Sequence, residues 1–209
     1  MKKVTKTKYV DNNGFSYDFE PVNDEVTIIK QGDKFKAFYL APDTYPQSPD
    51  EWDDCGVFIV NYHRDFWVEK KDIITADDLC AHYHGERLEI EDEYYIFPMS
   101  CLVHSGVWLS LAHSFACDSG GWDTSHVGAV LVSKKECPDE KTAEKWAEGQ
   151  VETWNQYLSG DVYGVVCETF NKDKEQLDQE SCWGFYGHES AKEELQSMIN
   201  YETKKVAEG

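Results

Sequence analysis

Residues 94–134 constrain the fold of this chain more than any other stretch. They combine the longest apolar run of the sequence with a polar, glycine-rich segment, CDSGGWDTSH. Residues 94–104 and 106–112 are predicted to pair as strands around the turn HSG, and residues 127–133 are predicted as a further core strand. We therefore expect buried strands around a polar centre, and any chemical site of the protein is expected at that centre.

Other segments predict further strands. Alternating apolar and polar residues predict hairpins within residues 6–19 and 26–40, because a period of two is typical of half-buried strands. Residues 56–62 (GVFIVNY) predict a buried strand. Residues 162–170 and 181–186 are predicted as a final strand pair, joined by the charged loop NKDKEQLDQE.

Helices are predicted in three places. Residues 139–158 carry an apolar stripe at i, i+3 and i+4 spacing, as expected for a helix packed on a core. A C-terminal helix is predicted with Ser190 as its N-cap and Glu193 completing a capping box. A shorter helix is predicted for residues 76–84, with Thr75 as its N-cap.

These elements predict an α+β fold. We expect an antiparallel β-sheet core with the two main helices packed on it, in a single domain covering residues 1–209. Residues 1–42 are a candidate N-terminal β-hairpin appendage of that domain. A hydrophobic content of 41% and an aromatic content of 14% supply enough apolar surface for such a core.

The net charge is the outlier of the composition. Forty acidic residues against twenty basic ones give a formal charge of −20. This charge disfavours direct binding to nucleic acid or to an anionic membrane, because both need a basic surface. It favours a basic protein partner, although a solvated surface tuned for solubility explains the same charge. Residues 43–93 are the densest in acid, with fifteen acidic and four basic residues.

Two parts of residues 43–93 concentrate the acids expected to contact a basic partner. In SPDEWDD a tryptophan stands among acids, which is the composition of a binding hot spot for a basic surface. The second part is the acidic run in ERLEIEDE, predicted as an exposed strand or a charged loop. The expected partner-binding residues are Asp50, Glu51, Trp52, Asp53, Asp54, Glu89, Glu91, Asp92 and Glu93.

The cysteines indicate neither disulfides nor a metal site. Seven cysteines occur without a CxxC pair, and the N-terminal MKKVTKTKYV lacks the apolar segment of a signal peptide, so a cytoplasmic location with free thiols is expected. Cys80, His82 and His84 come closest to a metal cluster, but positions i and i+2 of a helix point apart. We therefore predict no metal and no cofactor, and the sequence leaves the oligomeric state open.

Residues 53–62, DDCGVFIVNY, resemble the nucleophile motif of ubiquitin-like-protein-specific cysteine proteases. Those enzymes need a general-base histidine upstream of the cysteine, whereas the first histidine of this chain is His63. Cys55 is therefore interpreted as a cysteine that enters a strand.

The glycine-rich centre offers an alternative function. A cysteine, a histidine and an aspartate there could act as nucleophile, base and orienting carboxylate of a cysteine-dependent hydrolase. The same centre could instead hold a small molecule or a nucleotide, and such polar clusters in turns also commonly serve only the backbone of the turn. Whether the protein is an enzyme stays open. The catalytic candidates under this alternative are Cys117, His104, Asp123 and His126.

Several short blocks of the sequence, occurring in order between residues 48 and 187, match one family. They are SPDEWDDCG (48–56), HSG (104–106), FxC (115–117), WDTSHVG (122–128), VSK (132–134), VETWNQYLSGDVYG (151–164) and SCWGFYG (181–187). In these blocks the chain resembles a family of small proteins encoded by bacteriophages and mobile elements of Firmicutes and gut bacteria. The family has no established activity, so the resemblance assigns no catalytic role. The chain departs from the family pattern by the DSGG between Cys117 and Trp122.

The resemblance implies a setting for the function. Small acidic phage proteins often antagonise host machinery that binds nucleic acid, and some are DNA mimics that place carboxylates where phosphates would sit. We therefore expect a protein-binding inhibitor of a host defence system, of anti-restriction or anti-CRISPR type. Its expected partner is a basic host protein in the cytoplasm, bound without direct contact to nucleic acid or membrane.

Overall fold

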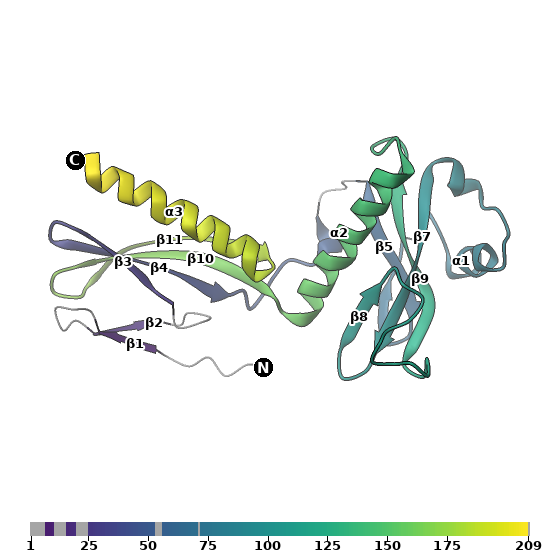
Figure 1. Ribbon diagram of the computed structural model, residues 1–209, viewed down its shortest axis with the longest axis horizontal. Helices are drawn as coiled ribbons and strands as arrows, with labels where there is room; N and C mark the ends of the chain where they lie inside the picture. The colour runs from purple at the N-terminus through teal and green to yellow at the C-terminus, as the bar shows by residue number, and fades with distance from the viewer. Residues whose placement is uncertain (1–6, 11–15, 20–24, 53–55, 71, 209) are drawn as a thin grey trace. The chain divides into compact units, whose positions relative to one another are not determined.

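The computed structural model describes residues 7–10, 16–19, 25–52, 56–70 and 72–208 (Figure 1). Every strand pairing among these residues is antiparallel, and helices accompany the sheets. The predicted α+β class with an antiparallel β-sheet core is therefore confirmed. Asp53, Asp54 and Cys55 lie outside the described residues.

Contacts between the described residues divide the chain into two compact units. The terminal unit consists of residues 1–46 and 160–209, and the central unit consists of residues 47–159. Each unit has its own sheet and its own long helix, so the two main helices pack on separate sheets. Residues 27–42, which we placed in the candidate N-terminal appendage, supply two strands to the sheet of the terminal unit.

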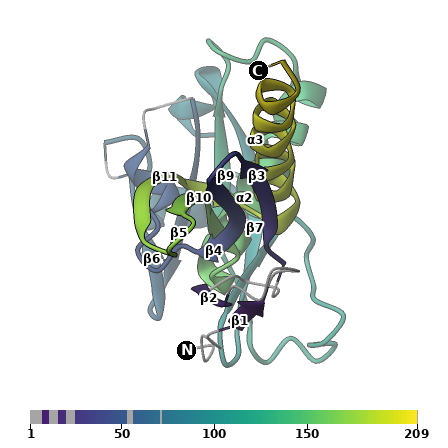
Figure 2. The same ribbon diagram turned by 90° about the vertical axis from the view of Figure 1, so that its left-hand side faces the viewer.

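The terminal unit is built on a four-stranded sheet in the order β11-β10-β4-β3, which Figure 2 shows from one end. β4 and β10 pair along nearly their whole length, from Pro42 opposite Tyr163 to Lys34 opposite Asn171. α3 packs on one face of this sheet, where Ala191 joins a buried cluster with Leu40. The elements are β3 (Thr27–Gln31), β4 (Lys34–Pro42), β10 (Val162–Asn171), β11 (Gln176–Tyr186) and α3 (His188–Glu208), beside a separate hairpin of β1 (Thr7–Val10) and β2 (Ser16–Phe19).

An ion pair between a partly buried lysine and a buried glutamate joins α3 to this sheet. Lys36 on β4 places Nζ 3.0 Å from Oε1 of Glu202, and the two side chains are 19% and 7% exposed. Burial alone would lower the pKa of Lys36, but the hydrogen bond and the charge of Glu202 outweigh it and raise that pKa. The ammonium therefore stays charged between helix and sheet, where a carboxylate is its main partner.

Two sequence predictions for the terminal unit are wrong. β11 begins at Gln176, whereas residues up to 180 were predicted as loop. α3 begins at His188, directly after Gly187 with its φ of 81°, so Ser190 lies inside the helix and is not its N-cap. The positive φ of Gly187 ends the preceding strand, and the helix therefore starts earlier than the predicted capping box.

The central unit is a five-stranded sheet in the order β6-β5-β9-β7-β8, with a helix on each face (Figure 1). α2 covers one face and α1 the other. The predicted strands and the predicted N-cap Thr75 are confirmed, the latter in a reciprocal capping box with Asp78. The elements are η1 (Pro49–Glu51), β5 (Val57–His63), β6 (Phe66–Val68), α1 (Ala76–Tyr83), η2 (Glu89–Asp92), β7 (Tyr94–Val103), β8 (Val107–Ser110), β9 (Thr124–Ser133) and α2 (Glu140–Ser159).

β9 is the central strand of this sheet, and it is apolar on both faces because a helix covers each of them. Val130 and Val132 belong to the cluster beneath α2, whereas Ala129 and Leu131 belong to the cluster beneath α1. Gly128 is needed because a Cβ there would lie 2.6 Å from Oδ1 of buried Asn61. A strand covered by helices on both faces needs such a continuous apolar run.

α2 also closes the free edge of the sheet at β8. Asn155 on α2 accepts a hydrogen bond from the backbone N–H of Leu109 at 2.8 Å and donates one to its carbonyl at 2.9 Å. Leu109 is buried, so these backbone groups would otherwise lack a partner at the sheet edge. The amide of Asn155 thus takes the place of a neighbouring strand.

We expect Asn155→Ala to lower the free energy of unfolding by about 2 kcal/mol, because two buried backbone groups lose their partner. Urea unfolding followed by circular dichroism measures the change. Gln156→Ala is the matched control, since the Gln156 amide makes only a 3.5 Å contact with Glu152. Equal losses in the two variants would contradict the role of Asn155.

Candidate functional site

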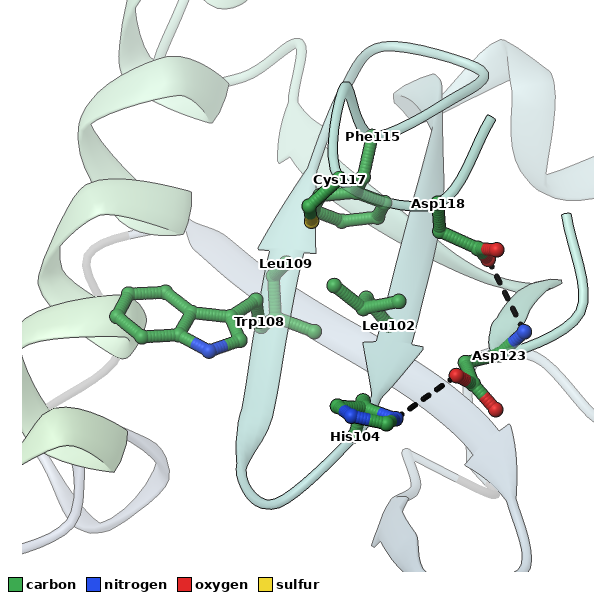
Figure 3. A pocket seen from close by; sticks show the side chains of 8 residues that line it. All are labelled: Leu102, His104, Trp108, Leu109, Phe115, Cys117, Asp118 and Asp123. Carbon is green, nitrogen blue, oxygen red and sulfur yellow. Dashed lines mark hydrogen bonds and ion pairs between the residues drawn. The ribbon is translucent and has the colours of Figure 1, made fainter. Parts of the chain in front are cut away.

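The glycine-rich centre lies where the β7–β8 hairpin meets the segment that returns to β9. In the hairpin turn the N–H of His104 donates to the carbonyl of Gly106 at 3.0 Å, and Ser105 has a φ of 52°. The return segment closes against β7, where the N–H of Val103 donates to the carbonyl of Asp123 at 3.0 Å. Hairpin and segment together form a pocket of about 340 Å³ (Figure 3).

The pocket has an apolar lining with a few polar groups around it. Leu102 and Leu109 are buried, while Trp108 is 47% exposed. Figure 3 shows the two leucines in the middle, with Asp118 and Asp123 on one side and Trp108 on the other. The lining residues are Leu102, His104, Trp108, Leu109, Phe115, Cys117, Asp118 and Asp123.

Asp118 holds the return segment together. Its Oδ1 accepts the N–H of Trp122 at 3.0 Å, and its Oδ2 accepts the N–H of Asp123 at 3.0 Å and the hydroxyl of Thr124 at 2.7 Å. The hydrogen bond from Thr124 holds the pKa of the Asp118 carboxyl below its usual range. Asp118 is therefore ionised at neutral pH. Sequence reasoning missed it, although an aspartate at the start of DSGGWD is typical of a turn that binds its own backbone.

His104 and Asp123 form a pair at the rim of the pocket. Nδ1 of His104 lies 2.9 Å from Oδ2 of Asp123 (Figure 3), and the side chains are 73% and 45% exposed. An ionised carboxylate only accepts hydrogen bonds, so Nδ1 is the donor and Nε2 remains for another partner. This is the base and orienting carboxylate of the hydrolase hypothesis.

Cys117 lines the same pocket but does not contact this pair. In Figure 3 the thiol lies beside Phe115, and His104 lies at the opposite end with Leu102 between them. Within the described residues no hydrogen bond joins Cys117 to a histidine. A cysteine nucleophile needs a base within hydrogen-bond reach, about 3 Å in an assembled site. The structure thus brings Cys117, His104 and Asp123 to one pocket without assembling a catalytic pair.

His126 is not among the residues that line the pocket. Its Nδ1 lies 3.0 Å from the hydroxyl of buried Ser100, and its ring lies 6.1 Å from that of His113. The nearby Cys101 is fully buried, and burial raises the pKa of its thiol to about 11. Cys101 is therefore a protonated core residue at neutral pH.

The two acidic segments lead into parallel strands of the central sheet. β5 and β7 are both antiparallel to β9, so they run parallel to each other and start at the same end of the sheet. At that end the N–H of Ser133 donates to Gly56 at 2.7 Å, and the N–H of Lys134 donates to Glu93 at 2.8 Å. We name this region the acidic end. Its exposed acids are Glu89, Asp92 and Glu93. Asp50, Glu51 and Trp52 are exposed as well, but they belong to η1 and its C-cap, and η1 contacts α2, whereas the residues beside η2 pack on the side of α1.

Glu91 differs from the other candidates because it serves the local fold. Its Oε1 accepts the N–H of Leu88 at 2.9 Å and lies 3.1 Å from Nδ1 of His82. The backbone hydrogen bond from Leu88 is the main cause that lowers the pKa of Glu91. The run predicted as strand or loop is a 3-10 helix, η2, and Glu91 fixes it to α1.

The residues around Cys80 do not gather into a metal site. His82 contacts Glu91, and within the described ranges no group of three or more His, Cys, Asp or Glu side chains is arranged to hold a metal ion. None of the described helices combines the length and apolar character that a membrane span requires.

No protein-family model matches the sequence, and searches of curated proteins and of solved structures give no match. A function is therefore inferred from the residues of this chain and from their geometry.

Proposed function

We propose that this protein is a non-catalytic inhibitor that binds a basic host protein through the acidic end of its central unit. The partner is a nucleic-acid-binding component of a host defence system, of restriction or CRISPR type, and the carboxylates occupy the basic groove that nucleic acid would fill. That the protein is encoded by a phage, as the sequence resemblance implies, is part of the same proposal.

One observation carries this proposal. Because β5 and β7 run parallel, the two acid-rich segments that precede them enter the sheet at the same end, although they are far apart in the sequence. Glu89, Asp92 and Glu93 are exposed there, and the net charge of −20 adds a long-range field that attracts basic surfaces. A surface of this kind speeds association with a basic groove and selects against acidic partners.

The hydrolase alternative has less support. His104 and Asp123 supply a base and its orienting carboxylate, but Cys117 lies at the other end of the pocket. Under the inhibitor proposal Cys117→Ala leaves partner binding unchanged, since the thiol lies in the pocket and not among the acids of the acidic end.

The proposal predicts salt-sensitive capture of a nucleic-acid-binding protein. Immobilised protein is incubated with a bacterial lysate from which nucleic acid has been removed, and bound proteins are identified by mass spectrometry. Capture at about 50 mM salt should fall steeply by about 300 mM, because screening shortens the reach of exposed charges. Added duplex DNA should release the partner. Capture that neither salt nor DNA weakens would contradict the proposal.

A further inference from the structure

The pocket at the glycine-rich centre has a charge and a lining that select a class of ligand. Its middle is formed by buried Leu102 and Leu109, and Trp108 and Phe115 add aromatic surface. Two carboxylates line it, Asp118 and Asp123, and its described lining contains no lysine or arginine. At about 340 Å³ the pocket falls within the range of small-molecule sites, which starts at about 300 Å³.

The charge states of these groups exclude anionic ligands. Asp118 is ionised because its hydrogen bonds lower its pKa. His104 is the only basic side chain in the described lining, and its Nδ1 is already engaged by Asp123. A phosphate or a nucleotide would therefore meet two carboxylates and no free cation. The charge of this pocket therefore disfavours a nucleotide, which was one of the ligands that the sequence left open.

A cation, in contrast, finds an acceptor there. Oδ2 of Asp123 accepts from His104, while its Oδ1 accepts no hydrogen bond from the residues that the structure describes. Asp118 lies next to it, with its Oδ2 accepting the N–H of Asp123. The aromatic rings of Trp108 and Phe115 offer apolar surface for the rest of such a ligand, away from the carboxylates.

We propose that this pocket binds a small organic cation with an apolar body, such as an arylalkylamine. The ammonium group donates to Asp123 beside Asp118, and the apolar body lies over Leu102 and Leu109 toward Trp108. Figure 3 shows the carboxylates and Trp108 on opposite sides of the two leucines, which fits a ligand that is charged at one end only. This site is separate from the acidic end, so it does not depend on the proposed inhibitor function.

The test compares three probes of similar shape and different charge. 2-Phenylethylamine, 3-phenylpropanol and 3-phenylpropionate are titrated at neutral pH, and amide and indole chemical shifts are followed by NMR. We expect the amine to bind with a Kd of about 1 mM or lower and to shift the indole signal of Trp108. The alcohol should bind about tenfold more weakly, and the acid should not bind detectably. Equal binding of acid and amine, or no binding of the amine at about 10 mM, would overturn the proposal.

Two variants locate the ligand. Asp123→Asn keeps the size of the side chain and should weaken amine binding about tenfold, since it removes the charge that pairs with the ammonium. Trp108→Ala changes a half-exposed residue of the edge strand and should weaken all probes that bind, whatever their charge. Glu144→Gln, on the exposed face of α2, is the control and should leave binding unchanged. Amine binding that survives both pocket variants, each verified as folded by its NMR spectrum, would show that the site is elsewhere and overturn the assignment.

Discussion

Glu202→Gln is expected to lower the free energy of unfolding by about 2 kcal/mol, because it leaves the partly buried Lys36 ammonium without its main carboxylate partner. The substitution conserves shape, so the loss reports charge pairing and not packing. Since α3 packs on the sheet that contains β4, the terminal unit should unfold first. Urea unfolding with hydrogen exchange resolved by residue measures both the loss and its place.

Two further variants separate the loss of the ion pair from other effects of the substitution. Glu193→Gln changes an exposed glutamate of the same helix and should cost less than about 0.5 kcal/mol. The double variant Lys36→Met with Glu202→Leu should recover most of the stability, because apolar residues of similar size can replace a buried ion pair without loss. If Glu202→Gln proves as stable as Glu193→Gln, the ion pair does not hold α3 to the sheet.

Neutralising the acidic end is expected to weaken partner binding by about tenfold or more at low salt. The variant combines Glu89→Gln, Asp92→Asn and Glu93→Gln, all exposed. It keeps Glu91, whose carboxylate serves η2 and α1. The Arg87–Asp92 pair that it removes is exposed on both sides, so the fold should lose little stability. Isothermal titration with the captured partner measures the affinity.

A matched control separates local charge from net charge. Glu144→Gln, Glu148→Gln and Glu152→Gln remove the same three charges from the exposed face of α2, in the same unit. This control should change affinity by less than about threefold, because it alters only the long-range field. Equal losses in the two triple variants would mean that the acidic end is not the contact surface.

The sequence predicted elements well where one face of them is buried. Residues 139–158 were predicted as a helix and α2 runs from Glu140 to Ser159, because its apolar stripe packs on the sheet. The capping residue Thr75 was identifiable because its contact with Asp78 is local. Patterns that are local, or that repeat with the period of one element, are visible in sequence.

The start of β11 was missed because its first residues bury nothing. Residues 176–180 are all exposed, so neither face imposes an apolar period on them. They are strand because β10 pairs with them across the hairpin, with Glu168 opposite Gln179 and Cys167 opposite Glu180. A strand held by backbone pairing alone does not differ from a charged loop in sequence.

Long-range partners were also beyond the sequence. β4 pairs with β10 although residues 47–159 of the central unit separate the two strands in the sequence. A pairing between segments so far apart leaves no local pattern in the sequence. At the candidate site, His104 and Asp123 were named from residue type, and their 2.9 Å contact comes from strands and a turn that only the fold brings together. The sequence also could not predict that Cys117 and His104 lie at opposite ends of the pocket.

The salt dependence of association tests whether the acidic end guides binding of the partner. Association rate constants of the purified partner with the native protein, with the acidic-end variant and with the α2 control are measured from about 50 to 300 mM salt. We expect the rate constant to fall steeply with salt for the native protein and the control, and to fall less steeply from a lower starting value for the acidic-end variant. If all three proteins have the same salt dependence and the same rates, the acidic end does not guide binding.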